Sequence, residues 1–410
     1  GAIAESRGDL DIALEHYAAS VDVDPNTTVA DDALWWQGRI LEDEGKLTDA
    51  RSLYTRLLDE YADSSWATNA AFRLGMLLFS DGDHRAAADA WGEGVSVATD
   101  PEEQQRLTYW RGKALLKAGD TTLGLPALDG LTTVNEDDYY GIRSLGLLAG
   151  QESLAQSTQE DDIDLAPSFD WASAEAWLAA KLGAQINDTA WATDSRWARS
   201  HELWRVGRNA QGDTEVFALI EAHANNGAAM YTLARRLQGE GRIGMAGRAG
   251  QRLLREIDTN PNAGLPKALL SLAYPAAFGP MVEKYAAEEG VSPLLLLAFV
   301  RQESFFDPRA VSPVGALGLT QVLPDTGSSI GQALGLSDVT EEGLLEAETN
   351  LRIGARYMAE QISEFDGEIF PALAAYNAGP NATQRWRQTA GNYADAFLVT
   401  IVFTVTRLYV

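Results

Sequence analysis

The first third of the chain carries a pattern of small and large residues that repeats every 37 positions. The glycines that mark the period are Gly8, Gly45, Gly82 and Gly119. In the first three copies an alanine follows five positions after the glycine, and a large aromatic residue follows nine positions after it: Tyr17, Tyr54 and Trp91. Each copy therefore predicts two helices joined by a glycine turn, with the aromatic ring filling the space between neighbouring helices.

A second register recurs on the helix that precedes each turn, where Gly38, Gly75 and Gly112 are spaced by the same interval. The combined pattern resembles tetratricopeptide repeats, in which a small residue lets paired helices approach and stacked units share one core. The resemblance implies an α-superhelix over residues 1–130. Such a surface could also dock protein partners.

Between residues 131 and 263 the strict period fades, but Trp171–Leu182 and Ala228–Gly239 keep helical spacing without strand-like alternation. We interpret this part as a continuation of the superhelix. Turn-forming residues at Asn260–Pro266 then favour a boundary, so residues 264–410 are predicted to form a separate domain. The predicted fold class is all-α.

One later segment combines a strong helix start with an apolar body and a polar end. Ser292 and Pro293 are typical of a helix N-terminus, and Leu294–Val300 is apolar on every face, which predicts a helix buried on all sides. The helix would then present Glu303 at its end. Partial burial there would raise the pKa of the carboxyl group, as a general acid near neutral pH requires.

Charge and composition exclude several classes of partner and of functional site. The net charge is −27, of which residues 264–410 contribute little, with 16 acidic against 9 basic residues. An acidic surface disfavours nucleic acid and anionic membranes as partners. The absence of cysteine excludes disulfides and thiolate ligands, and no apolar run is long enough to span a membrane. The chain begins at Gly1 without a basic, apolar leader, which leaves export open.

The four histidines are scattered and none lies in residues 264–410, so we expect neither a metal site, nor a serine triad, nor a cofactor. Most of the tryptophans precede residue 264 and are interpreted as packing residues. Trp191, Trp197 and Trp204 are kept as candidate sugar platforms.

Four ordered motifs give the chemistry a family context. They are Arg301-Gln302-Glu303-Ser304, Ser312-Pro313-Val314-Gly315-Ala316, Gly318-Leu319-Thr320-Gln321 and Ala374-Ala375-Tyr376-Asn377-Ala378-Gly379-Pro380. In order and spacing they resemble the soluble lytic transglycosylase family. The likeness extends to Tyr274-Pro275, Asn350–Gly354 and Thr406-Arg407, and more weakly to Tyr139-Tyr140-Gly141.

The resemblance implies a lysozyme-like, mostly helical catalytic domain that cleaves the β-1,4 bond between N-acetylmuramic acid and N-acetylglucosamine in peptidoglycan, leaving 1,6-anhydromuramoyl ends. Glu303 would act as acid and then as base, while Ser312, Gln321, Tyr376 and Asn377 would line the glycan cleft. It also implies a periplasmic, extracellular or cell-wall-associated protein.

The chain departs from the family pattern at Thr320, where methionine is usual, and at Val399, Val402 and Val405, where acids and a proline are usual. Two alternatives therefore stay open beside the transglycosylase. One is a goose-type lysozyme-like hydrolase, and the other is a non-catalytic peptidoglycan-binding scaffold. The choice between cleavage at strand ends and within strands is also open.

Overall fold

The computed structural model describes residues 1–23, 25, 27–134, 139–150, 165, 168–257, 264–336 and 339–390. These residues are built from helices, with isolated β-bridges only at Leu317, which pairs with Val311 and Val322. The predicted all-α class is confirmed. The departures at Val399, Val402 and Val405, the Thr406-Arg407 motif and the Asn260–Asn262 turn lie outside the described residues. None of the described helices is both long and apolar enough to cross a membrane.

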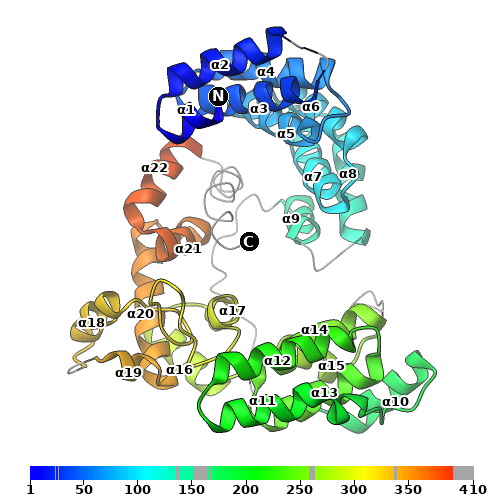
Figure 1. Cartoon of the computed structure of the whole chain (residues 1–410), viewed down its shortest axis with the longest axis vertical. Coiled ribbons are helices and arrows are strands. Elements are labelled where there is room, and N and C mark those ends of the chain that lie inside the picture. Colours follow the sequence, from blue (N-terminus) through cyan, green and yellow to red (C-terminus); the bar gives the residue numbers. More distant parts are fainter. Residues whose placement is uncertain are drawn as a thin grey trace. The chain divides into compact units, whose positions relative to one another are not determined.

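The chain divides into two compact units, Gly1–Ser153 and Leu154–Val410. The first unit is a series of helices in which each one from α2 onward packs against the next in chain order (Figure 1). Its helices are α1 (Ala2–Ser6), α2 (Leu10–Val23), α3 (Thr28–Asp43), α4 (Leu47–Glu60), α5 (Ala67–Ser80), α6 (His84–Val97), α7 (Pro101–Lys117), α8 (Thr121–Val134) and α9 (Tyr139–Leu148).

The two sets of glycines in this unit have different structural roles. Gly8, Gly45, Gly82 and Gly119 adopt φ angles of 82°, 75°, 84° and 82°, a left-handed conformation that glycine adopts without strain. In the other register a Cβ atom would collide with the large residue of the next helix. At Gly38 it would lie 2.5 Å from the Tyr54 ring, and at Gly75 2.3 Å from the Trp91 ring. The predicted pairing of small and aromatic residues is therefore confirmed.

We expect Gly75→Ala to destabilise the first unit by about 1–3 kcal/mol, because the added methyl group must displace the fully buried Trp91 ring. Gly130→Ala on α8 is the matched control, since a Cβ there meets no atom within 4 Å and alanine favours a helix. Urea unfolding of the two variants checks this. Equal midpoints would contradict the packing argument.

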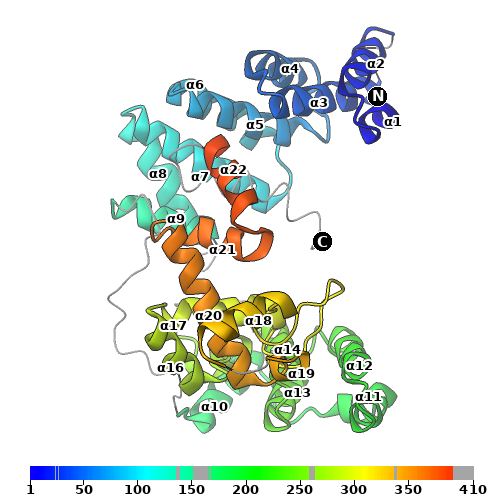
Figure 2. The same cartoon turned by 90° about the vertical axis from the view of Figure 1, so that its left-hand side faces the viewer.

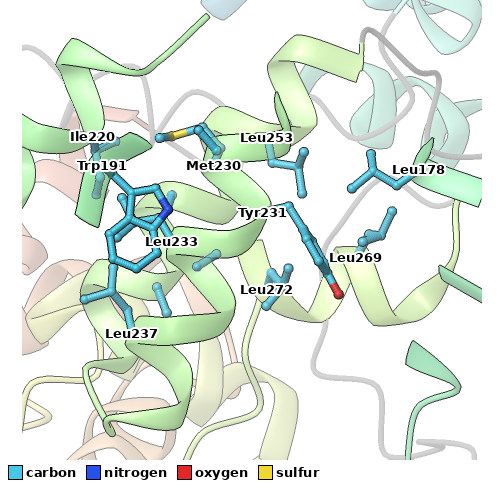
Figure 3. Close-up of a cluster of buried hydrophobic side chains, with 14 of the residues drawn as sticks. Leu178, Trp191, Ile220, Met230, Tyr231, Leu233, Leu237, Leu253, Leu269 and Leu272 are labelled. Carbon is cyan, nitrogen blue, oxygen red and sulfur yellow. The ribbon is translucent and has the colours of Figure 1, made fainter. Parts of the chain in front are cut away.

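The second unit begins with a helical layer around an apolar core, which Figure 3 shows from close by. Its helices are α10 (Trp171–Leu182), α11 (Ser195–Arg205), α12 (Asn209–Ala222), α13 (Gly227–Gly239), α14 (Ile243–Ile257) and α15 (Lys267–Ala273), with a 3₁₀ turn at Ala190–Thr193. Trp191 lies in this core and donates a hydrogen bond from Nε1 to Thr232 at 2.9 Å. Trp197 and Trp204 pack against it.

The central helix of the remaining part is α20 (Ala347–Glu364), which contacts α16, α18, α19 and α21 (Figure 2), while α22 packs against α21. The bounds of the other helices are α16 (Gly279–Glu289), α17 (Pro293–Ser304), α18 (Pro324–Ala333), α19 (Glu341–Leu344), α21 (Ile369–Ala378) and α22 (Pro380–Ala390). The apolar core between α16, α17 and α20 positions the end of α17, where Glu303 lies.

Candidate active site

Helix α17 starts as the sequence predicts. The Ser292 hydroxyl accepts a hydrogen bond from the Leu295 amide, and Pro293 occupies the first turn. The prediction of burial on every side is wrong, because Leu294 is 45% exposed. Leu296 and Val300 are fully buried, so the helix packs along one face at the edge of the core.

Glu303 lies in the last turn of α17 and is largely buried. Burial raises the pKa of its carboxyl group from 4.5 to about 7. Among the described residues none forms a hydrogen bond or an ion pair with this carboxyl group. A buried carboxyl with such a pKa can hold a proton, release it and take one back near neutral pH.

The chain leaves α17 through an unusual turn. Phe305 and Phe306 both have positive φ angles, 51° and 64°, which non-glycine residues rarely adopt. Their packing stabilises this conformation: Phe306 is 3% exposed, and α14 approaches Phe305 through glycine. A Cβ at Gly244 would lie 2.5 Å from the Phe305 carbonyl oxygen, and one at Gly247 would lie 2.9 Å from its ring. The position of the Glu303 helix end is thus fixed from two sides.

Two guanidinium groups pack on the Phe305 ring. The Cζ atom of Arg248 on α14 lies 4.6 Å from the ring centroid, and that of Arg301 on α17 lies 5.3 Å from it. Arg301 also lies 4.9 Å from the ring of Tyr274. The Nε atoms of both arginines are buried, and no hydrogen-bond partner for them is found among the described residues. Cation–π contacts hold these groups in place.

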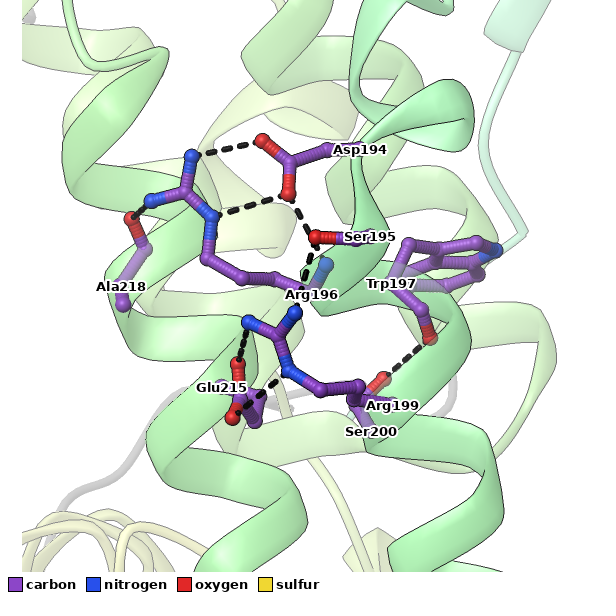
Figure 4. A network of polar contacts seen from close by, with 8 residues as sticks. All are labelled: Asp194, Ser195, Arg196, Trp197, Arg199, Ser200, Glu215 and Ala218. Carbon is purple, nitrogen blue, oxygen red and sulfur yellow. Dashed lines mark hydrogen bonds and ion pairs between the residues drawn. The ribbon is translucent and has the colours of Figure 1, made fainter.

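Other arginines of the same unit are paired with carboxylates, as Figure 4 shows on α11. Arg196 pairs with Asp194 at 2.6 Å, and Arg199 pairs with Glu215 at 2.7 Å. The two arginines at Phe305 form no such pair in the part of the chain that the structure describes. Positive charge therefore stands beside the Glu303 helix end in a chain whose net charge is −27.

Two predicted site residues shape the loop that follows. The Ser312 hydroxyl accepts a hydrogen bond from the Ala316 amide at 2.9 Å and closes a turn. The Gln321 side chain donates from Nε2 to the Gly318 carbonyl at 2.9 Å, and its own φ angle is 50°. Both residues thus hold the loop in one conformation.

The other two predicted residues lie at the end of α21. The Tyr376 hydroxyl donates to the Thr320 carbonyl at 3.0 Å, and its ring packs edge-on against Phe299 with centroids 4.4 Å apart. Asn377 is exposed. Gly379, with φ at 84°, ends the helix. The contact with Phe299 brings α21 against α17, and burial together with the nearby Glu303 raises the pKa of Tyr376.

Asn350 is a functional candidate that the motif analysis left without a role. It is fully buried on α20, and its Oδ1 atom accepts from the Thr320 amide at 2.8 Å and the Thr320 hydroxyl at 2.7 Å. Its Nδ2 atom donates to the Leu317 and Leu344 carbonyls at 2.9 and 2.7 Å. The sequence feature that could have identified it is spacing: Asn350 lies three residues before Ile353, so its amide is on the same face of the helix as an apolar residue.

Family models match most of the first unit and part of the second. Residues 280–398 match the Transglycosylase SLT domain, and residues 3–65 and 72–137 match a tetratricopeptide repeat. Residues 280–398 are an SLT domain. The resemblance to the soluble lytic transglycosylase family is thereby confirmed, and so is the repeat character of the first unit.

Sequence relatives of residues 280–398 support the match to the SLT domain. The chain is 36% identical over 140 residues to a soluble lytic murein transglycosylase of Salmonella typhimurium, covering 33% of this chain and 22% of the relative. The corresponding protein of Escherichia coli K12 is 33% identical over 140 residues, with the same coverage. The aligned region is thus about a fifth of the length of these relatives.

Solved structures resemble the chain over a longer stretch. The 70-kDa soluble lytic transglycosylase of Escherichia coli matches 96% of this chain and 59% of its own, with a TM-score of 0.61 and 21% identity. An inactive Glu→Gln mutant of the lytic transglycosylase Slt of Pseudomonas aeruginosa matches 99% of this chain and 69% of its own, with a TM-score of 0.56 and 19% identity. At these identities the likeness shows the fold.

Proposed function

We propose that this protein is a lytic transglycosylase that cleaves the β-1,4 bond between N-acetylmuramic acid and N-acetylglucosamine in peptidoglycan. The observation that carries the proposal is Glu303, a buried carboxyl group with a pKa near 7 in an SLT domain. The curated relatives are named soluble lytic murein transglycosylases, which supports the substrate class.

In the proposed reaction Glu303 first donates its proton to the glycosidic oxygen, which leaves with the N-acetylglucosamine residue. The resulting carboxylate then removes the proton from the 6-hydroxyl group of the muramic acid, whose oxygen bonds to C1. The product ends in a 1,6-anhydro ring, and Glu303 is protonated again. Because the nucleophile belongs to the sugar itself, no second carboxylate is required to activate water.

The proposal assigns glycan contacts to Ser312, Gln321, Tyr376 and Asn377, around the carboxyl group of Glu303. It places the protein in the periplasm or at the cell wall, where its substrate lies, and leaves the helical repeats available to protein partners. The division into residues 1–130, 131–263 and 264–410 stays a prediction.

Product analysis tests the proposed reaction. Purified sacculi are incubated with the protein, and the released muropeptides are separated and weighed by mass spectrometry. We expect anhydro ends, which are lighter by one water than hydrolysed ends. Hydrated reducing ends would instead favour the goose-type lysozyme-like hydrolase, and binding without release would favour the scaffold.

The pKa of Glu303 also predicts how activity and stability depend on pH. Activity needs the protonated acid, so we expect kcat/KM to fall as the pH rises through about 7. The folded-state pKa exceeds the ordinary value of 4.5, so this group stabilises the fold fully below pH 4.5 and loses that contribution as the pH rises to about 7.

Glu303→Gln removes this titration. Between pH 4.5 and pH 8 the wild type should therefore lose about 2–3 kcal/mol of folding free energy that the variant does not lose. Hydrogen exchange in α17, measured for both proteins at pH 4.5 and pH 8, gives the difference in stability between variant and wild type. If this difference were the same at both pH values, it would contradict the raised pKa of Glu303.

A further inference from the structure

The guanidinium groups of Arg248 and Arg301 are partly buried but keep their outer nitrogen atoms accessible. The Nε atom of each group is buried, and both residues are partly exposed. The Nη atoms are not among the buried unpaired atoms, and none of them forms a hydrogen bond or an ion pair with a described residue. They therefore reach solvent. The atoms with which arginine binds carboxylates are thus available to a ligand in both groups.

Aromatic rings hold both groups in position. The Cζ atoms of Arg248 and Arg301 lie 4.6 and 5.3 Å from the centroid of the Phe305 ring, and Arg301 also lies 4.9 Å from that of Tyr274. Tyr274 is 53% exposed, so this place is at the surface. A guanidinium group held on rings loses little further freedom when it binds a ligand. We call Arg248, Arg301 and the Phe305 ring the arginine site.

One carboxyl group of α12 lies near the arginine site. Asp213 accepts a hydrogen bond from Trp204 Nε1 at 3.0 Å. Burial raises the pKa of Asp213, and Asp307 adds to this rise. The Trp204 hydrogen bond, Arg242 and Arg248 lower the pKa, but to a smaller extent. Because the net shift favours the neutral form, Asp213 compensates the charge of Arg248 less than an ordinary aspartate would.

Arg301 and Glu303 point to opposite sides of α17. An α-helix turns by about 100° per residue, so side chains two positions apart point about 200° apart. Their neighbours agree with this. Phe299, one turn before Glu303, packs on Tyr376 of α21. Arg301 packs instead on Phe305, which contacts α14. A ligand that reaches both Glu303 and the arginine site must therefore pass around the end of α17.

The width of the helix determines how long such a ligand must be. An α-helix with its side chains is about 10–12 Å across, and an extended peptide spans at most about 3.3–3.6 Å per residue. A branch of about three to four residues would therefore reach from a sugar at Glu303 to the arginine site. The muramic acid of peptidoglycan carries such a branch, a short stem peptide with free carboxylates on its lactyl group. A carboxylate attached directly to the sugar would be too close to Glu303.

We propose that Arg248 and Arg301 bind carboxylate groups of the stem peptide, about three to four residues from the muramic acid whose bond is cleaved at Glu303. This inference rests on the proposed function and adds the stem peptide to its substrate. The arginines contact the peptide and not the reacting atoms, so they act on the binding of glycan strands and hence on KM. They make the enzyme prefer strands that carry stems.

The first test is the binding of a soluble stem tetrapeptide to the full chain, labelled with ¹⁵N in its arginine side chains. The Nε signals are assigned as those lost in Arg248→Gln and in Arg301→Gln. We expect both signals to shift with the tetrapeptide, and the same peptide with amidated carboxyl groups to bind about 10-fold more weakly. This comparison changes only the ligand, so it does not depend on the folding of any variant.

Three results would overturn the proposal. They are an unshifted signal of either arginine, equal affinity for the amidated peptide, and equal affinity for acetate or inorganic phosphate. The last result would show a general anion site without any preference for the peptide.

Variants test the two arginines directly. Arg248→Gln and Arg301→Gln should each weaken tetrapeptide binding about 10-fold, the effect of one charge-assisted hydrogen bond that stays open to water. Arg301→Lys keeps the charge but loses the planar fork, so its affinity should be intermediate. Arg255→Gln is the matched control, because Arg255 is an exposed arginine on the same helix as Arg248. Equal weakening by Arg255→Gln would mean that net charge alone acts, contrary to the proposal.

Strands with and without stems separate this inference from the proposed function. For Arg301→Gln, the ratio of kcat/KM on stem-bearing strands to kcat/KM on strands stripped by an amidase should fall about 10-fold, whereas Arg255→Gln should keep the wild-type ratio. A wild-type protein that binds the tetrapeptide but releases no anhydro products would refute only the proposed function. An active wild type with equal KM on both kinds of strand would refute only the stem-binding site.

Discussion

Glu303→Gln should lower the rate of sacculus solubilisation by about 10² to 10⁴-fold, the usual contribution of a positioned general acid. Glutamine keeps the size and shape of the side chain but carries no proton that it can transfer to a glycosidic oxygen. Because Glu303 has no hydrogen-bond or ion-pair partner among the described residues, the substitution leaves no partner unsatisfied. The loss is therefore expected in kcat, with binding of sacculi retained.

Glu360→Gln is the control for the loss of a carboxylate. Glu360 forms a partly exposed ion pair with Arg356 on the surface of α20, and such pairs contribute little to stability. The Glu360→Gln variant should solubilise sacculi at the wild-type rate. If the wild type, Glu360→Gln and Glu303→Gln all solubilised sacculi equally slowly, the protein would be a peptidoglycan-binding scaffold instead of an enzyme. If all three were equally fast, Glu303 would not be the acid.

Gly318→Ala should cost about 3 kcal/mol of local stability, the largest effect of a single methyl group that we expect in the SLT domain. Gly318 has a φ angle of 74°, and a Cβ there would lie 2.3 Å from Asn350 Nδ2 and 2.4 Å from the Leu344 carbonyl oxygen. The methyl group would therefore strain the backbone and also separate Asn350 from its partners. Hydrogen exchange of the peptide that spans the loop measures the loss.

Gly315→Ala separates these two effects. Gly315 has a similar φ angle of 84°, but a Cβ there meets no atom within 4 Å. Its substitution should cost only the backbone term of about 1–2 kcal/mol. Equal costs at the two positions would show that the contact with Asn350 contributes nothing to the loop.

The helical repeats were largely predictable because their signals are local and periodic. The 37-residue spacing of Gly38 and Gly75 gave the helix pairs, and the aromatic rings of Tyr54 and Trp91 occupy the space above those glycines. The start of α17 at Ser292 was predictable for the same reason, since caps depend on neighbouring residues. Which face of α17 is buried was not predictable, because an all-apolar run does not reveal that Leu294 is exposed.

The amino-acid sequence by itself determined the helical class, the repeat unit and the choice of Glu303 as the reactive acid, since each depends on residues close together in the chain. Only the tertiary structure decided that Tyr376 points its proton at Thr320, and that Asn350 of α20 holds Thr320 in place. These contacts join residues 30 and 56 positions apart. Hydrogen-bond direction and burial depend on which distant groups meet, and no spacing along the chain specifies them.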